Sequence, residues 1–398
     1  MTTQLLAVHH GGGLGGAPVS LVKLLARLDR NDFASRVAFT EAGAVMEYAG
    51  KSGVVVEIVP TGGAFFYSAH ARLSVRSIGQ FVRTFPGAVQ SAQLSLRRQR
   101  PDLVHLNTSV LLAWAAAARR ERVPVVWMVR EVLGPNHWLR RWHAQFIDNH
   151  AARVVAISHS VAACLNPPVD VVHNAVDLDE FKLSLLEQAP LVRRELGLPR
   201  DRQIVMTIGS VQRPKGHWLL LDAMQLLPAN VDLVLVTGGV APAYVHTPRG
   251  RIKRALTLPL DNLDALKREA ARRGLRERIH VTGFRTDVAR VLAAADVLVF
   301  PSTEPEGFGR PIIEAMALAR PVVATDIGPS AEVLGAQAGG LVPVDAEELA
   351  AAVTSLFDAP DVRAEMGCAG RARVEACFSL DRQVAQMSAI YRQVAQIA

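Results

Sequence analysis

The sequence predicts an α/β protein with two doubly wound domains, and three observations lead to this prediction. Short apolar, β-branched runs alternate with helical patterns along the chain. The alternation pauses near residue 180 and then begins again. The chain has 398 residues, more than one typical domain needs, and 50% of them are hydrophobic, enough for two cores. Near-continuous apolar strands joined by helices are typical of parallel sheets covered on both faces.

The first domain is expected over residues 1–180. Helical patterns at 19–28 and 111–120 separate short apolar runs there. These runs are the expected strands 5–9, 36–39, 54–59, 103–107, 123–129, 154–157 and 169–173.

The second domain is expected over residues 181–379. Its first part, 181–201, is polar and contains proline, so we expect a linker there. The helix 217–227 places its leucines on one side at helical spacing. The expected strands are 204–208, 233–236, 279–282, 297–300, 322–324 and 340–342. In doubly wound folds, ligands bind beyond the carboxyl ends of the strands.

The composition favours an anionic ligand. The formal net charge of +7 suits nucleotides, phosphorylated acceptors or the headgroup surface of a membrane. The basic residues are scattered rather than striped, so we expect no nucleic-acid partner. No apolar run has the length of a membrane span, and Met1-Thr2-Thr3 lacks the basic start of a secretory signal. The three cysteines suit a reducing compartment, so we expect a cytoplasmic protein, with peripheral contact at the inner membrane face as a further expectation.

The stretch 306–314, Glu-Gly-Phe-Gly-Arg-Pro-Ile-Ile-Glu, is the most informative feature of the chain. It follows an apolar strand, and Pro311 fits the first turn of a helix. The free N–H groups and the dipole of a helix start favour an anion, and glycines let the backbone approach a ligand. Glu306 and Glu314 can instead accept hydrogen bonds from hydroxyls. The stretch therefore predicts a sugar-nucleotide site; for Glu314 alone, a structural role in the first helical turn is the alternative.

A second glycine-bounded loop, 209–216, also follows a strand and precedes a helix. Its two cations, Arg213 and Lys215, can clamp a diphosphate with charge-assisted bonds of roughly 1.5–3 kcal/mol each. A solvated surface loop is the alternative interpretation.

The stretch 306–314 resembles the signature of the family-4 retaining glycosyltransferases. The resemblance implies the GT-B fold, in which two Rossmann-like domains face each other across a cleft and the final helix, here 380–398, completes the first domain. It implies that Glu306 holds hydroxyls of the donor sugar and Glu314 the ribose hydroxyls. The residues between them that would reach the sugar and the phosphates are Gly307, Phe308, Gly309 and Arg310.

The same resemblance places further donor contacts in the second half of the chain. Lys215 has the usual position in the family's diphosphate-binding segment. Many members carry an arginine where this chain has Ser210, so Arg213 would supply the second charge from another point of the loop. Phe284 and Arg285 fall in the segment whose backbone meets the nucleobase edge.

In the first half, Gly15 and Gly16 best match a glycine pair that faces the donor from the opposite domain. Arg130 stands where many members have a histidine; it would steady a phosphate, and Glu131 would orient an acceptor hydroxyl. The alternative for these two is a salt-bridging pair at a strand end. His105 ends a neighbouring strand as a further candidate for substrate binding, with a structural histidine as the alternative.

Two segments are candidates for contact with the acceptor: the aromatic loop 64–67 and the aromatic and cationic stretch 137–143. A further stretch, 240–260, is basic and follows a strand. For 137–143 the choice is between a membrane-surface helix and a core helix with a solvated face. For 240–260 it is between a lid and a surface insertion. Asp177 and Asp179 lie in a hinge context, so we expect no metal there and no cofactor elsewhere.

The function expected from these features is metal-independent, retaining transfer of a sugar from a nucleoside-diphosphate sugar. A UDP-sugar donor is favoured by analogy, and the acceptor is a sugar, lipid-linked or small-molecule hydroxyl. Lys215, Arg213 and the helix start at Pro311 would stabilise the departing diphosphate. The alternatives are a sugar-nucleotide epimerase or a phosphorylase of the same fold, or a non-catalytic sugar-nucleotide-binding protein.

Overall fold

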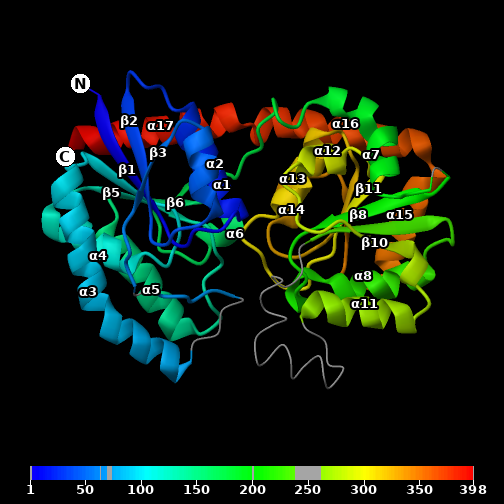
Figure 1. The fold of residues 1–398 in the computed structure, drawn as a ribbon, viewed down its shortest axis with the longest axis horizontal. Helices are drawn as coiled ribbons and strands as arrows, with labels where there is room; N and C mark the ends of the chain where they lie inside the picture. The colour runs from blue at the N-terminus through cyan, green and yellow to red at the C-terminus, as the bar shows by residue number, and fades with distance from the viewer. Residues whose placement is uncertain (1, 63, 70–73, 200, 238–260, 398) are drawn as a thin grey trace. The chain divides into compact units, whose positions relative to one another are not determined.

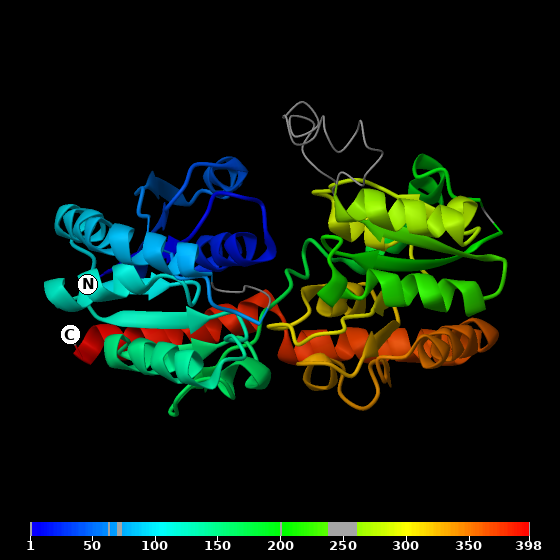
Figure 2. The same cartoon turned by 90° about the horizontal axis from the view of Figure 1, so that it is seen from below.

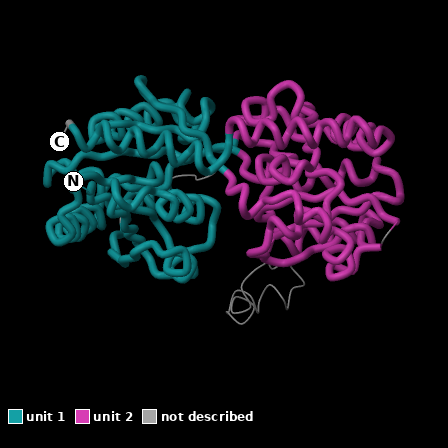
Figure 3. Tube along the Cα trace, turned by 90° about the horizontal axis from the view of Figure 1, so that it is seen from above, with its two compact units in different colours: residues 1–175, 306–308, 378–398 teal, residues 176–305, 309–377 magenta. Residues whose placement is uncertain are grey.

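The structure, a computed structural model, describes residues 2–62, 64–69, 74–199, 201–237 and 261–397. The chain forms two compact units. Unit 1 comprises residues 1–175, 306–308 and 378–398, and unit 2 comprises residues 176–305 and 309–377 (Figure 3). The whole basic stretch 240–260 lies outside the described residues, so both interpretations of it stay predictions.

Unit 1 is built on a seven-stranded sheet with the order β3-β2-β1-β4-β5-β6-β7, and every strand pair is parallel (Figure 1). Each strand falls on a predicted apolar run. The strands are β1 (Thr3–His9), β2 (Phe33–Phe39), β3 (Val55–Ile58), β4 (Leu103–Leu106), β5 (Val125–Val129), β6 (Arg153–Ala156) and β7 (Asp170–Val171).

Helices cover both faces of this sheet (Figure 2). The last of them, α17, packs on α1, β4 and β5, and its fully buried Tyr391 meets the ring of Phe33 at 5.8 Å between centroids. The chain end therefore contributes to the core of unit 1. The helices are α1 (Gly16–Arg27), α2 (Ala44–Lys51), α3 (Val75–Gln99), α4 (Leu112–Glu121), α5 (His137–His150), α6 (His159–Ala162) and α17 (Leu380–Ile397).

Unit 2 is built on a six-stranded parallel sheet with the order β10-β9-β8-β11-β12-β13. The central strands β9, β11 and β12 are buried along their whole length, as expected for a sheet covered on both faces. The strands are β8 (Gln203–Ile208), β9 (Val231–Val236), β10 (Ile279–Val281), β11 (Val297–Phe300), β12 (Val322–Thr325) and β13 (Gly340–Val342).

Helices also lie on both faces of the unit 2 sheet (Figure 2). Apolar side chains of α8, α11 and α15 form one core cluster with the strands. The α-helices are α7 (Ala189–Glu195), α8 (His217–Leu226), α11 (Asn262–Arg272), α12 (Val288–Leu292), α13 (Arg310–Ala317), α14 (Ser330–Leu334), α15 (Ala346–Asp358) and α16 (Pro360–Cys377).

The prediction that 181–201 is a linker is wrong. This stretch holds the 3-10 helix η1 (Leu183–Gln188) and α7, both in unit 2. The Arg193 side chain donates to the carbonyl of Ala294 at 3.0 Å and pairs with Asp296 at 2.8 Å. The polar character that suggested a linker therefore comes from side chains that bind the body of the unit.

Each sheet has a point where the strand order reverses. It lies between β1 and β4 in unit 1 and between β8 and β11 in unit 2. The loops that leave two such strands run in opposite directions, which opens a crevice beyond their carboxyl ends, the usual ligand position in this class of fold. The residues after β1 and β4, and those after β8 and β11, are therefore the places to examine for a site.

Candidate functional site

In unit 2, the loop after β8 lies directly against the segment after β11. The backbone N–H of Thr303 donates to the carbonyl of Pro214 at 2.8 Å, and the Thr303 hydroxyl donates to the carbonyl of Arg213 at 3.3 Å. Gly216 has φ +70°, and a β-carbon there would collide with the carbonyl oxygen of Pro301. Only glycine fits both the dihedral angle and the space, so Gly216 fixes the two segments against each other.

The cations of this loop occupy a short 3-10 turn, η2 (Arg213–Lys215). The Arg213 guanidinium lies over the indole ring of Trp218, 4.7 Å from its centroid, in a cation–π contact. Ser210, at the other end of the loop, accepts a hydrogen bond from Gln212 at 3.0 Å. Lys215 and Arg213 therefore come from the same turn, beside the end of β11.

Helix α13 begins at the expected place, with Gly309 as its N-cap at φ +85° and Pro311 in its first turn. Glu314 is 7% exposed, and Arg310 donates to its carboxylate at 2.6 Å. This i, i+4 pair fixes the orientation of the Glu314 carboxylate. The first turn of α13 holds no acidic residue, so the alternative of a structural role for Glu314 in that turn is wrong.

The segment 306–308 belongs to unit 1, although β11 and α13 on either side of it belong to unit 2. Its backbone is held by Ser158, whose hydroxyl donates to the carbonyl of Gly307 at 2.7 Å. A β-carbon at Gly307 would collide with the carbonyl oxygen of Arg130. Glu306 is 9% exposed, and the Phe308 ring is buried beside Phe378. The glycine at 307 is thus required by packing as well as by the predicted approach of a ligand.

The crevice of unit 1 is lined by polar residues at the ends of β1 and β4. Asn107 lies 3.1 Å from the Nδ1 atom of His9, and the Nδ1 atom of His10 lies 3.0 Å from the Thr108 hydroxyl. Burial, with the nearby His10 and Arg130, holds the pKa of His9 well below its usual value. His9 is therefore neutral at pH 7 and contributes hydrogen bonds rather than charge.

Arg130 and Glu131 follow β5, the next strand of the same sheet. Arg130 is 7% exposed, and its guanidinium donates to the side-chain oxygens of Asn107 at 3.1 Å and Asn174 at 2.5 Å. The Glu131 carboxylate accepts from the backbone N–H of Ser109 at 3.0 Å and from that of Arg130 at 3.3 Å. Each side chain thus has partners of its own, and both are fixed before any ligand arrives.

His105 is fully buried in the core of unit 1. Its Nδ1 atom bonds the hydroxyl of Tyr391 at 2.9 Å, and burial lowers its pKa to about 4. A neutral, enclosed histidine that binds a helix of the same unit fits the structural alternative. We therefore leave His105 out of the ligand contacts proposed below.

The glycine run after β1 has two different roles. A β-carbon at Gly12 would lie 2.5 Å from the backbone of Ala42, so Gly12 is required by packing of the next loop. At Gly15 the nearest atom would be Pro18 Cδ at 3.6 Å, an ordinary contact. Gly15 and Gly16 are exposed at the start of α1, where a ligand can approach them.

The predicted nucleobase segment follows β10, at the edge of the unit 2 sheet. Gly283 has φ +78°, and the Phe284 side chain is 64% exposed. Arg285 makes two hydrogen bonds to Asp287, at 2.8 and 2.6 Å, and these lower the pKa of Asp287. Arg285 is therefore held within its own loop, whereas the ring of Phe284 is open to contact.

Several residues around the ends of β1, β4 and β5 were not predicted from the sequence: His9, His10, Asn107, Asn174 and Ser158. The first three could have been identified by their position in the fold. Each stands at or just beyond the carboxyl end of a strand next to the reversal of strand order. That position is visible only when the strand order is known. Asn174 and Ser158 carry no motif and are identified by their contacts alone.

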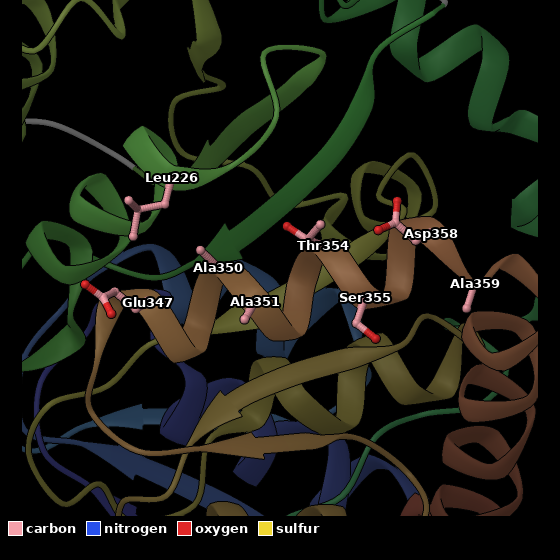
Figure 4. A pocket seen from close by; sticks show the side chains of 8 residues that line it. All are labelled: Leu226, Glu347, Ala350, Ala351, Thr354, Ser355, Asp358 and Ala359. Carbon is pink, nitrogen blue, oxygen red and sulfur yellow. The ribbon is translucent and has the colours of Figure 1, made fainter.

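A separate cavity of about 690 Å³ lies on unit 2, between α8 and α15 (Figure 4). Leu226 contributes from α8, and most of the other lining side chains are small residues along α15. None of the predicted site residues lines it, so we assign it no function. Among the described residues, no helix is both long and apolar enough to cross a membrane.

Comparison with known proteins gives a consistent result. Residues 14–180 match the model described as Glycosyltransferase Family 4, and residues 189–373 match the model of Glycosyl transferases group 1. The chain is 28% identical to the lipopolysaccharide core biosynthesis mannosyltransferase LpsB of Rhizobium meliloti, over 79% of this chain and 90% of that protein. It is 33% identical to the alpha-maltose-1-phosphate synthase of Mycolicibacterium smegmatis, over 66% of this chain and 69% of that protein.

Among solved structures, the chain resembles HepE of Anabaena, which was crystallised with UDP and glucose. The TM-score is 0.78 at 23% identity, and the match covers 98% of this chain and 99% of HepE. WaaG, a glycosyltransferase involved in lipopolysaccharide biosynthesis, matches with a TM-score of 0.66 at 16% identity, over 97% and 99% of the two chains. These likenesses confirm the predicted GT-B fold.

Proposed function

Since this chain belongs to the group 1 glycosyltransferases of family 4, we propose that it transfers a sugar from a UDP-sugar to an acceptor hydroxyl with retention of configuration. Family membership makes it a glycosyltransferase with a nucleotide-sugar donor. The choice of UDP, the role of each residue and the nature of the acceptor are the parts that we propose.

The observation that carries the proposal is the contact between the lysine-bearing loop and the segment after β11. Thr303 bonds Pro214 at 2.8 Å, and Gly216 packs under Pro301. The turn with Lys215 therefore stands beside the loop that leads to α13, at the reversal of strand order in unit 2. A diphosphate bound there meets a lysine and the start of a helix, and both favour negative charge.

Sugar transfer requires that the negative charge on the leaving diphosphate be stabilised. The bond from the anomeric carbon to the diphosphate oxygen breaks, and a bond from that carbon to the acceptor oxygen forms. The acceptor hydroxyl gives its proton to the departing diphosphate, so the step balances without a separate base. Lys215 and Arg213 stabilise the charge that grows on the diphosphate, which lowers the barrier. Glu306 and Glu314 then bind hydroxyls of the donor.

The donor proposal draws on the solved relative. HepE was crystallised with UDP-glucose, with a TM-score of 0.77 to this chain. In this chain the exposed Phe284 offers a ring for the nucleobase, in the loop that the family resemblance assigns to it. We therefore propose uridine as the base and glucose as the first sugar to test.

We assign the acceptor to the crevice of unit 1. There, Glu131 is fixed by two backbone N–H groups and can accept a hydrogen bond from a hydroxyl. Arg130 is held by two asparagines and fixes the surrounding loops, which makes it a positioning residue. Gly15 and Gly16 supply exposed backbone in the same unit.

We also propose that α5 contacts a lipid surface. Its Trp138 and Trp142 side chains are 77% and 46% exposed, and the exposed Arg141 lies between them in the sequence. His143 and Ala144, on the opposite side of the helix, are buried. The helix is thus packed on one face and carries an aromatic and cationic face outward, which suits an anionic headgroup layer.

The function is tested by incubating the protein with UDP-glucose, UDP-galactose or GDP-mannose, with and without acceptor sugars, and measuring nucleoside diphosphate release and products. We expect diphosphate release with a UDP-sugar. Lys215→Ala should lower turnover roughly ten- to a hundredfold, the loss of one charge-assisted contact. Lys267→Ala, an exposed lysine on α11, is the matched control and should leave turnover unchanged.

The other outcomes identify the rival functions. Interconversion of two UDP-sugars without acceptor indicates an epimerase. Release of a sugar phosphate on addition of inorganic phosphate indicates a phosphorylase. Nucleotide binding without turnover of any donor indicates a non-catalytic protein. An unchanged rate in Lys215→Ala would remove the lysine loop from the proposed site.

A further inference from the structure

Three side chains of unit 1 interact with His10, and together with it they form what we call the Phe66 cluster: His10, Glu41, Phe66 and Glu131. The rings of His10 and Phe66 meet edge to face, with centroids 5.4 Å apart. Burial lowers the pKa of His10, and the carboxylates of Glu131 and Glu41 oppose this shift. The cluster thus combines an aromatic ring, an imidazole and two carboxylates.

Phe66 stands out from its neighbours in the chain. Phe65 and Tyr67 are 5% and 4% exposed, whereas Phe66 is 53% exposed. The loop is pinned by the backbone bond from Phe65 to Val110 at 3.2 Å and by the Tyr67 hydroxyl, which donates to the carbonyl of Asn136 at 2.9 Å. A large apolar ring is therefore presented to solvent from a fixed backbone, as in ligand sites that use an aromatic wall.

The polar members of the cluster are oriented in advance. The Glu131 carboxylate is bound by the backbone N–H of Ser109 at 3.0 Å. The imidazole of His10 bonds the Thr108 hydroxyl through Nδ1 at 3.0 Å. A carboxylate accepts hydrogen bonds and an imidazole can donate or accept, so these groups suit the hydroxyls of a sugar.

The charge of the cluster argues against a phosphorylated ligand. Its two carboxylates, Glu41 and Glu131, would repel a phosphate. The nearby Arg130 does not offset them, because this residue is buried and its guanidinium donates to Asn107 and Asn174. An uncharged ligand with an apolar face and several hydroxyls can stack on the ring of Phe66 and donate hydrogen bonds to the carboxylates.

We propose that the Phe66 cluster is an acceptor subsite for a neutral sugar, whose ring lies on Phe66 and whose hydroxyls bond Glu131 and His10. This rests on the proposed function and adds the chemical class of the acceptor. It also gives His10 a role in acceptor binding, and it selects Phe66 from the aromatic loop 64–67 that the sequence already marked as a candidate for the acceptor side.

The test is saturation-transfer NMR on the full chain in the presence of UDP. The ligands are neutral methyl glucosides, methyl mannosides and disaccharides on one side, and glucose 1-phosphate and inositol 1-phosphate on the other. We expect binding of at least one neutral sugar, a loss of at least tenfold in its affinity in Phe66→Ala, and recovery in Phe66→Tyr. Leu94→Ala, which removes an exposed apolar side chain from α3 of unit 1, is the matched control and should bind as the wild type does.

Each other result overturns the proposal. These results are no binding of any neutral sugar, preference for the phosphorylated ligands, or affinity that is unchanged in Phe66→Ala. UDP binding, followed in the same samples, separates this inference from the proposed function. If UDP binds and the sugars behave otherwise, only the acceptor class fails; if UDP does not bind, the donor site fails first.

Discussion

Gly307 packs directly against the backbone carbonyl of Arg130, with no room for a β-carbon between them. The hydroxyl of Ser158 holds the other side of the same residue, through the carbonyl of Gly307 at 2.7 Å. The residue after the proposed donor glutamate Glu306 is therefore fixed to the loop that carries Arg130 and Glu131. This contact links the donor motif to the acceptor residues within unit 1.

Gly307→Ala should destabilise the protein and impair transfer. The added methyl must displace the Arg130 loop, and overpacking of this kind costs typically 1–3 kcal/mol. Thermal unfolding should show a lower Tm, and donor turnover should fall as Glu306 moves. Gly87→Ala is the matched control, since its β-carbon meets nothing within 4 Å and it lies within α3, where alanine is favoured over glycine. A Tm for Gly307→Ala at or above the wild-type value would contradict this account of the contact.

Gly216→Ala should weaken nucleotide binding. Its β-carbon would overlap the carbonyl oxygen of Pro301, and its φ of +70° disfavours any residue with a side chain. The Lys215 turn must then separate from the end of β11. Isothermal titration with UDP should show at least a tenfold weaker Kd, with the fold retained by circular dichroism. Gly197→Ala, at φ +69° but with no atom within 4 Å, is the control that isolates the collision from the dihedral strain.

Buried histidines should make the protein less stable in mild acid. Burial lowers the pKa values of His105 and His143 to about 4, from 6.5. Between these values the unfolded chain binds protons that the folded chain does not, so the free energy of unfolding falls as pH drops from about 6.5 to 4. Each histidine contributes a slope of up to about 1.4 kcal/mol per pH unit.

Urea unfolding at a series of pH values measures this slope. His143→Gln should make the slope smaller, because a buried titrating group is removed. His137→Gln, at an exposed position of the same helix, should leave it unchanged. If the stability of the wild-type protein is flat between pH 6.5 and 4, the two histidines do not stay neutral in the fold.

The strands were predictable because each is a short, continuous apolar run. Such runs are typical of strands in a parallel sheet that is covered on both faces. Every predicted strand is present, from β1 to β13. The prediction of a linker at 181–201 was wrong because the polar side chains of this stretch were assumed to be exposed to solvent. Arg193 is polar, yet it serves to bind the carbonyl of Ala294 and the carboxylate of Asp296. The sequence shows that a side chain is charged, but it does not show which groups that side chain contacts in the fold.

The proposed donor loop could be located from the sequence for the same local reason, since glycines, cations and a helix start stand together in the sequence. The crevice of unit 1 was not, because its members come from strands that are distant in the chain. His10 and Thr108 are neighbours only because β1 and β4 pair in register. The approach of a ligand to the glycine at 307 stays a prediction, and the structure shows a packing reason for this glycine in the carbonyl of Arg130.

The outward face of α5 predicts binding to anionic membranes. Sedimentation with vesicles of phosphatidylglycerol and phosphatidylcholine should carry the protein down, more weakly at high salt. Trp138→Ala with Arg141→Ala should weaken binding at least tenfold, because an arginine near an anionic surface contributes about 1 kcal/mol and the exposed indole adds apolar burial. Phe284→Ala removes an exposed aromatic from unit 2 and should bind vesicles as the wild type does. Equal sedimentation of the double variant and the wild type would leave α5 as a core helix with a solvated face.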